Sequence, residues 1–334
     1  MVRNSTPQRP MPSGAFGHVL VSSASAKVPL VRAVMNAARR LDPPARVIAG
    51  DLDESALARY VADEFWHMPR AEDQQLEALM AGCMQRGIGS IFPTRDGELL
   101  FWAQHQARFA SKGIDVVVSP AASVRICVDK LAFARFGAEH GFPFIPAAEH
   151  PDQLDHGPYV VKERFGAGGR KIGLDLAGNA AVEHGRSLEQ PIYQPFVAGK
   201  EISVDAWLDR SHQAKGLVLR TRDRVVDGES QITTTFRDRE IEDLAMQVLH
   251  ALKLRGPVVM QMRIDAKHEP HVIECNARFG GASTASISAG LDLFYWSLLE
   301  SRGASLGAYP FHRLERELRQ VRVREDICIH GDRF

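Results

Sequence analysis

The first third of the chain alternates short apolar segments with segments of helical periodicity. The apolar segments are rich in β-branched residues and lie at 18–23, 46–51, 64–68, 89–93 and 115–120. Between them, apolar residues recur at helical spacing near 29–41, 72–86 and 98–112, and a polar helix is expected near 54–62. Short strands that alternate with helices are typical of a parallel sheet covered by helices on both faces.

Polar residues follow several of these strands. Asp51 ends one of them, and TRDGE at 94–98 follows another. Turn formation explains these residues most simply, but open parallel sheets usually bind ligands outside the carboxyl ends of their strands, where the same residues could hold a polar substrate. No GxGxxG follows the first strand, which excludes the usual dinucleotide-binding fingerprint.

The pattern of predicted helices and strands changes near residue 119. We expect one helix within 123–143, which Gly141 and Pro143 would end. Strand-rich segments joined by glycine-containing turns follow, at 159–176, 191–208, 212–222, 256–266 and 269–277. Such a pattern indicates antiparallel α+β structure.

Composition excludes several classes of protein. The chain has 41 Lys and Arg residues and 41 Asp and Glu residues, so its formal net charge is zero. No overall electrostatic field therefore attracts it to nucleic acid or to an anionic membrane. The four cysteines form no CxxC pair, which argues against a zinc site or a disulfide framework and favours the cytoplasm. No apolar run approaches 18 residues, and residues 1–17, rich in Pro, Ser and Arg, are expected to be a disordered leader.

The stretch HVIECNARFGG at 271–281 places Glu274, Asn276 and Arg278 at alternate positions. In an extended strand these three side chains share one face with Val272, while Ile273, Cys275 and Ala277 face the opposite side. Gln261 lies thirteen residues before Glu274, and a short turn at KHEP would make their strands antiparallel neighbours. Three oxygen donors would then meet, either as ligands of Mg²⁺ or as a hydrogen-bonded polar network.

Two further segments have the chemistry of a nucleotide site. Lys162 precedes a loop with Gly166, Gly168 and Gly169, which could close on phosphate oxygens or form a flexible hairpin. Pro195 cannot donate to a strand ladder, which suits an edge strand or a linker, and an exposed edge backbone beside Phe196 and Val197 could exchange hydrogen bonds with a purine. Glu201, Ser203 and Asp205 alternate on the next strand, which a simple polar strand face also explains.

Taken together, these segments resemble a known family. VDK at 128–130, VVKERFGAGG at 160–169, YQPFVAGKEISVDAW at 193–207 and VIECNARFGG at 272–281 have the order and spacing of the ATP-grasp enzymes. The resemblance covers about 18–300 and is greatest to the branch built like the ATP-binding part of the carbamoyl-phosphate synthase large chain.

The resemblance implies a fold of mixed α/β and α+β class. An N-terminal Rossmann-like, parallel-sheet (pre-ATP-grasp) domain would cover 18–118 and an α+β lid 119–192. A C-terminal antiparallel α+β grasp domain would cover 193–310, and 311–334 would be a tail with an edge strand.

The resemblance also assigns roles to individual residues. The ATP-binding set would be Lys130, Lys162, Gly166, Gly168, Gly169, Gln194, Pro195, Phe196, Val197 and Glu201. The metal ligands would be Gln261, Glu274 and Asn276. The substrate-binding set would be Arg220, Arg222, Arg278, Gly280, Gly281 and Ser283, with Arg278, Lys162 and Arg220 in catalysis.

The expected reaction joins a small carboxylic acid, such as an amino acid, to an amine through an acyl phosphate, with release of ADP and phosphate. Its cofactors would be ATP and one or two Mg²⁺ ions, for which Mn²⁺ could substitute. A glutamine at 261 departs from relatives with a carboxylate there and weakens the case for a second ion. Phosphorylation of bicarbonate or carbamate, or nucleotide binding without turnover, are the alternatives. The resemblance also suggests a homodimer, and the zero net charge predicts that it binds neither nucleic acid nor membrane.

Overall fold

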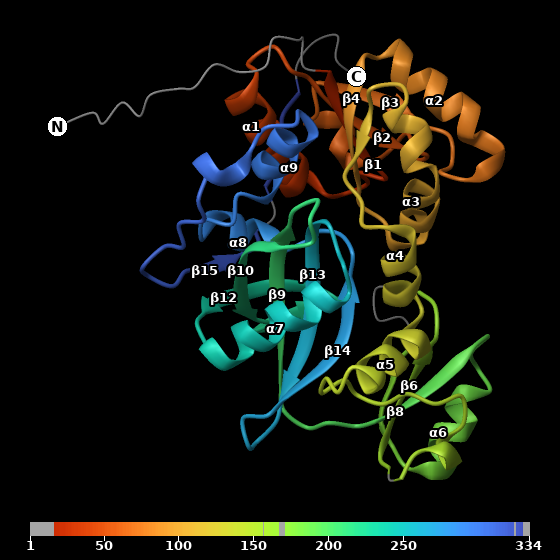
Figure 1. Cartoon of the computed structure of the whole chain (residues 1–334). Helices are drawn as coiled ribbons and strands as arrows, with labels where there is room; N and C mark the ends of the chain where they lie inside the picture. Colours follow the sequence, from red (N-terminus) through yellow and green to blue (C-terminus); the bar gives the residue numbers. More distant parts are fainter. Residues whose placement is uncertain (1–16, 156, 167–170, 324, 330–334) are drawn as a thin grey trace.

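The structure is a computed structural model that describes residues 17–155, 157–166, 171–323 and 325–329. Within these ranges the strands form three sheets of five, seven and three strands. The five-stranded sheet lies at one end of the molecule and the seven-stranded sheet in the middle. The three-stranded sheet lies at the opposite end of the molecule, beside the seven-stranded sheet (Figure 1). The expected combination of a parallel N-terminal sheet with antiparallel α+β structure is confirmed.

The N-terminal sheet is parallel and has the order β3-β2-β1-β4-β5. Its strands are β1 (His18–Ser22), β2 (Val47–Asp51), β3 (Glu64–His67), β4 (Ile88–Pro93) and β5 (Asp115–Val116). The helices between them are α1 (Val28–Leu41), α2 (Leu76–Gln85) and α3 (Asp96–Ala110). The helix expected near 54–62 is only the 3₁₀ turn Leu57–Tyr60, and a second such turn, Asp73–Gln75, precedes α2.

The helix expected within 123–143 is in fact two helices, α4 (Ala121–Val128) and α5 (Lys130–Glu139). Asp129 separates them because it adopts an extended conformation and its carboxylate accepts the backbone N–H groups of Leu131 and Ala132. An aspartate in this position caps the second helix instead of continuing the first. Helix α5 ends where predicted, just before Gly141, whose φ is +67°.

The three-stranded sheet consists of β6 (Tyr159–Glu163), β7 (Gly173–Leu176) and β8 (Pro191–Pro195), with β6 in the centre. It packs on α6 (Gly178–Gly185) around a small core of its own that contains Val161 and Tyr193. Because neighbouring side chains on a strand point to opposite faces, Lys162 and Gln194 project from the other face. A short 3₁₀ turn, Pro151–Gln153, precedes this sheet.

The large sheet has the order β11-β12-β10-β9-β13-β14, and β15 pairs with β12. Its strands are β9 (Lys200–Leu208), β10 (Ala214–Thr221), β11 (Arg224–Val226), β12 (Glu229–Phe236), β13 (Gly256–Ile264), β14 (Pro270–Asn276) and β15 (Arg319–Val321). One face packs on α7 (Arg239–Ala251) in the main hydrophobic core. The helices α8 (Ser283–Ser288) and α9 (Leu293–Ser301), followed by the 3₁₀ turn Leu306–Ala308, are associated with the other face, where Trp207 contacts Trp296.

A β-bulge corrects one prediction about β14. Gln261 pairs with Glu274, but Met262 pairs with Val272, so one extra residue lies between them on β14. The bulge turns Val272 to the core face beside Cys275, whereas we expected it to share a face with Glu274. Ile273 is half-buried and outside the core clusters of the described residues.

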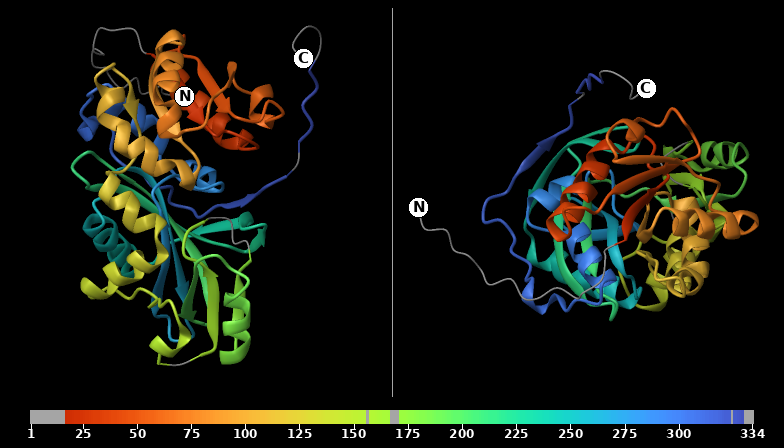
Figure 2. Two further views of the ribbon diagram at one scale, coloured as in Figure 1. Left: turned by 90° about the vertical axis from the view of Figure 1, so that its right-hand side faces the viewer. Right: turned by 90° about the horizontal axis from the view of Figure 1, so that it is seen from above.

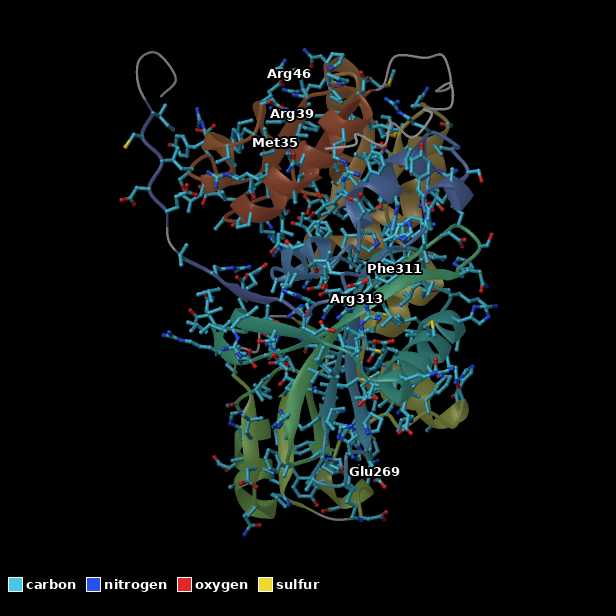
Figure 3. The ribbon with its side chains drawn as sticks, turned by 90° about the vertical axis from the view of Figure 1, so that its left-hand side faces the viewer. Met35, Arg39, Arg46, Glu269, Phe311 and Arg313 are labelled. Atoms are coloured by element: carbon cyan, nitrogen blue, oxygen red, sulfur yellow. The ribbon has the colours of Figure 1, made fainter. Side chains whose placement is uncertain are left out.

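The hydrophobic core is continuous between the first two sheets, since Leu20 of β1 belongs to the same cluster as Val204 of β9. After β15 the chain runs back toward α1 (Figure 2), where Glu325 pairs with Arg32 at 2.8 Å. Glu269 marks the tip of the β13–β14 hairpin, at the opposite end of the molecule from Arg39 and Arg46 (Figure 3). Within the described ranges, no helix combines the length and the apolarity needed to cross a membrane. The division at 118, 192 and 310 stays a prediction.

Candidate functional site

Four strands of the large sheet place polar side chains in one row. The register sets Arg220 opposite Ser203, Ser203 opposite Gln261, and Gln261 opposite Glu274, as predicted for the last pair. All four lie on the face away from α7, because the residues between them enter the core shared with that helix. Helices α8 and α9 pack over one end of this face, which leaves the end with Glu274 turned toward Lys162 of the three-stranded sheet.

Glu274 is the centre of a small cluster of oxygen and amide groups. Its Oε1 accepts a hydrogen bond from Asn276 Nδ2 at 3.2 Å. When the Gln261 amide is oriented by its neighbours, its nitrogen donates to the same Oε1 at 3.0 Å and its oxygen accepts from an Arg222 guanidinium nitrogen at 3.1 Å. The three predicted ligands therefore meet and form a hydrogen-bonded polar network, and their role as ligands of Mg²⁺ stays a prediction.

This donor set fits a single hard divalent cation. Glu274 supplies a carboxylate, and the amide oxygen of Asn276 lies two residues along the same strand. Mg²⁺ is usually held by one or two such groups together with nucleotide phosphates. Gln261 is the weaker candidate, because its oxygen is engaged by Arg222.

Lys162 faces this cluster from β6. The side chain is only 5% exposed, and burial lowers the pKa of its amine to about 8, although the charge of Glu274 acts in the opposite direction. Among the described residues, none accepts a hydrogen bond from this amine. A buried ammonium of this kind is costly unless an anion accompanies it.

Lys130 begins α5 and reaches the same region from another side. Its Nζ donates to the carbonyl of Gly166 at 2.8 Å, and burial lowers its pKa. The preceding Asp129 binds Arg164 with two hydrogen bonds of 2.8 and 2.6 Å. These contacts tie the start of the glycine loop to α5. Gly168 and Gly169 lie outside the described residues.

The end of β8 and the segment after it border the site with both apolar and polar groups. Gln194 is buried, and its amide nitrogen donates to the carbonyl of Ile145 at 3.2 Å. Phe196 donates its backbone N–H to Pro158, and Pro195, Phe196 and Val197 are all half-buried. A flat apolar ligand could lie against these residues.

Glu201 lies at the start of β9 on the same face as Gln261. Its two carboxylate oxygens pair with Arg222 at 2.9 Å and with Arg263 at 3.3 Å. Burial lowers the pKa of Arg222, and the neighbouring Glu201 carboxylate partly offsets that effect. The carboxylate is therefore held in place by two guanidinium groups.

Arg220 is buried in a second network, which the sequence reasoning missed. Its Nε pairs with Asp205 at 2.6 Å, and the hydroxyls of Ser283 and Ser286 donate to the same carboxylate at 2.6 Å each. We considered Asp205 as part of a polar strand face, yet it is fully buried. The alternation of Glu201, Ser203 and Asp205 could not distinguish these environments. One guanidinium nitrogen of Arg220, NH1, is buried without a hydrogen-bond partner in the described chain.

Arg278 lies in the loop after β14 and contacts the N-terminal sheet domain. It pairs with Asp96 in the first turn of α3 and donates to the carbonyl of Phe279 at 2.9 Å. Gly280 follows, and its N–H donates to Ser283 Oγ at 2.8 Å. Asp96 was not singled out from the sequence, although it belongs to the TRDGE segment.

Two family models match the chain. Residues 19–117 match the PylC-like N-terminal domain, and residues 187–324 match the model described as ATP-grasp in the biosynthetic pathway with the Ter operon. The chain is an ATP-grasp protein. The expected resemblance is confirmed at this level, whereas the finer assignment to the carbamoyl-phosphate synthase-like branch stays a prediction.

Solved structures agree with this fold. The biotin carboxylase domain of the Hydrogenobacter thermophilus 2-oxoglutarate carboxylase, a dimer in complex with MgADP, ADP and bicarbonate, matches with a TM-score of 0.74 at 15% identity, over 92% of this chain and 75% of that one. N5-carboxyaminoimidazole synthetase from Staphylococcus aureus, complexed with ADP, gives 0.68 at 18% identity over 87% and 79%. The L-amino acid ligase of Bacillus licheniformis gives 0.65 at 17% identity over 86% and 75%.

At these identities the likeness to solved ATP-grasp structures concerns the fold alone. A search of curated protein sequences finds no significant match. The ATP-grasp family contains both ATP-dependent ligases and carboxylases.

Proposed function

We propose that this ATP-grasp protein is a carboxylate–amine ligase that consumes ATP and joins two small molecules. The observation that supports the proposal most directly is the buried amine of Lys162, which has no acceptor among the described residues and lies near Glu274. A nucleotide triphosphate would supply the missing negative charge. Structural neighbours complexed with ADP and MgADP share the fold and are consistent with ATP and Mg²⁺ as cofactors.

In this proposal the lysines hold the phosphates. Lys130 and Lys162 would contact phosphate oxygens from two sides, and the loop containing Gly166, Gly168 and Gly169 would cover them. Lys130 already donates a hydrogen bond to the Gly166 carbonyl, so the lysine that would contact phosphate is joined directly to the glycine loop. A covered site protects a reactive intermediate from water.

The base and the ribose would lie at the border between β8 and β9. Phe196 and Val197 would pack on the adenine, whose edge would bind Gln194 and the backbone of 195–197. Glu201 would accept hydrogen bonds from the ribose hydroxyls, and its two arginine partners would hold the carboxylate in place.

Glu274 and Asn276 would hold Mg²⁺, with Gln261 as a weaker, neutral ligand. When bound there, the ion offsets part of the charge on the phosphate oxygens. The single carboxylate in the cluster favours one ion over two. Mn²⁺ would bind the same oxygen donors.

Arg278 would orient the transferred phosphoryl group. An oxygen of the substrate carboxylate attacks the γ-phosphorus, the bond to ADP breaks, and an acyl phosphate forms. The amine nitrogen then attacks the carbonyl carbon, loses a proton and displaces inorganic phosphate. A guanidinium at this place would stabilise the charge that develops on the phosphoryl oxygens.

The roles proposed for Arg220, Arg222, Gly280, Gly281 and Ser283 concern the acceptor side. Arg220 and Ser283 are buried and bound to Asp205, so they would support the substrate site from beneath its surface. Arg222 and Gly281 are half-buried and Gly280 is buried, and all three would contact substrate. Gly281 would approach it with its backbone.

A screen of acid and amine pairs tests the proposal. We expect phosphate release that requires ATP, a carboxylic acid and an amine together, with an amide product by mass spectrometry, and loss of both in Glu274→Gln. Phosphate release that requires bicarbonate instead would favour the carboxylase alternative, which several structural neighbours represent. Nucleotide binding without turnover under any pairing would favour a non-catalytic module.

A further inference from the structure

A pocket of about 640 Å³ opens at the carboxyl edge of the N-terminal sheet. Its walls come from Asp51 at the end of β2 and from the segments that follow β1, β2, β3 and β4, including Ser23, Arg70 and Arg95. In this sheet β1 lies between β2 and β4, so the chain progresses toward one edge through β2 and β3 and toward the other through β4 and β5. Such a reversal of strand order creates the crevice in which open parallel sheets bind ligands.

The pocket contains positive groups that the protein does not neutralise. Arg70 and Arg95 are exposed, and neither guanidinium group makes a hydrogen bond or ion pair with any described residue. Lys27 is a third cation of the lining, and its amine donates to the carbonyl of Ser23 at 3.0 Å. Burial lowers its pKa, and the nearby charge of Arg278 acts in the same direction.

Two of the three carboxylates of the pocket accept hydrogen bonds from the loop between β1 and α1. Asp51 accepts the backbone N–H groups of Ser25 at 2.7 Å and Asp53 at 3.0 Å. Glu98 is buried and accepts the hydroxyl of Ser23. Glu72 is the third carboxylate of the lining and is exposed. The two free guanidinium groups therefore favour a ligand with an anionic group.

The pocket adjoins the place where phosphoryl transfer is proposed. Arg95 and Gly97 line the pocket, and Asp96 between them pairs with Arg278. Lys27, another residue of the lining, is close enough to Arg278 for the two charges to interact. A ligand in this pocket would thus lie next to the reacting groups.

We infer that this pocket binds a second anionic group, a carboxylate or a phosphate, of the substrate that reacts near Arg278. Arg70 and Arg95 contact that group, and Lys27 contributes positive charge between it and Arg278. The inference rests on the proposed ligase function in identifying the bound anion as part of a substrate. That the pocket binds an anion is a separate claim. It assigns the substrate to small molecules with an anionic group remote from the reacting one.

Ligand-observed NMR titrations of the full chain test the inference. The probes are succinate, which carries carboxylates, glycerol 3-phosphate, which carries a phosphate, and glycerol, which carries no charge. We expect at least one anion to bind at millimolar concentration and glycerol not to bind. Arg70→Gln and Arg95→Gln should each lower the affinity for the anion by about tenfold, because each removes a charge-assisted hydrogen bond. The double variant should lower the affinity further.

Arg239→Gln is the matched control, since Arg239 is almost fully exposed on α7. This variant should leave anion binding unchanged, and all variants should bind Mg·AMPPNP as the wild type does. The anion that binds identifies the group as carboxylate or phosphate. The inference is wrong if neither anion binds, or if the double variant binds them as tightly as the wild type. Failure of Mg·AMPPNP to bind the wild type would instead contradict the proposed function.

Discussion

Asp96 and Arg278 form an ion pair between the first turn of α3 and the loop that follows β14. The two residues are 182 positions apart in sequence, and they join the parallel sheet domain to the edge of the large sheet that holds Glu274 and Asn276. Arg278 is thereby fixed beside both the proposed metal ligands and the pocket of the N-terminal domain. This contact connects two sites that the sequence presents as separate.

Replacement of Arg278 tests its role in phosphoryl transfer. Arg278→Gln should lower the rate of phosphate release by roughly 10²–10³-fold, the usual loss when one donor to a developing oxyanion is removed. Arg278→Lys should not restore it, because one ammonium cannot contact Asp96 and a phosphoryl oxygen as a guanidinium can. Calorimetry should show Mg·AMPPNP affinity near that of the wild type. Wild-type turnover in Arg278→Gln would exclude the role.

Lys162 predicts a specific dependence of stability on pH. Its pKa is lowered from 10.5 to about 8 in the folded protein, so the unfolded chain binds more protons between these values. The free energy of unfolding of the wild type should therefore rise with pH through that window, relative to Lys162→Met. Below pH 8, where the buried amine is charged, Lys162→Met should be the more stable protein by about 1–3 kcal/mol.

Denaturant unfolding of both proteins on either side of the window measures this effect. Lys162→Arg, which stays charged throughout, is the control and should show no such rise. The same Lys162→Met variant should bind Mg·AMPPNP more weakly despite its greater stability. Equal pH profiles for wild type and Lys162→Met would show that the amine is not perturbed by burial.

The Gln261 and Glu274 pair predicts how many ions bind. Glu274→Gln should abolish saturable Mn²⁺ binding in the presence of AMPPNP, as measured by electron paramagnetic resonance, because it removes the only carboxylate of the cluster of three predicted ligands. Gln261→Glu adds a second carboxylate opposite the first. It should raise the number of bound ions, and without metal it should lower stability because two like charges face each other. Unchanged stoichiometry in Gln261→Glu would contradict this reading of position 261.

The buried ion pair of Asp205 and Arg220 predicts a large cost when one partner is lost. Asp205→Asn should lower the free energy of unfolding by about 3–5 kcal/mol, since it leaves a buried guanidinium without its counter-charge. The double variant Asp205→Asn with Arg220→Met should recover part of that loss. A single-variant cost similar to that of an exposed pair, such as Arg239 and Asp243, would show that the pair is unimportant for stability. Urea unfolding of both variants and of the wild type supplies the comparison.

Much of the fold follows from local patterns in the sequence. The parallel sheet was predictable because strands such as 18–23 and 46–51 alternate with helical segments. The pairing of Gln261 with Glu274 was predictable because a short turn joins their strands. The break at Asp129 was missed because apolar periodicity continues across it, although its capping chemistry was visible in the sequence.

Local patterns failed where a long-range contact or a single extra residue decides the outcome. The bulge at Ile273 reverses the face of Val272, and strict alternation cannot reveal it. The burial of Asp205 depends on Ser283 and Ser286, which α8 brings over β9 from about 80 residues away. The pairing of Asp96 with Arg278 is a contact of the same kind.

The order of residues specifies which chemical groups this protein has and, for the most part, on which strands and helices they lie, because strand and helix periodicity depend on neighbouring residues. The tertiary structure alone decided which charges are buried, which are paired and which remain free, as for Lys162, Asp205 and Arg95. The physical reason is that the energy of a charge depends on its distance from water and from other charges. Those distances exist only once segments that are remote in sequence have packed together.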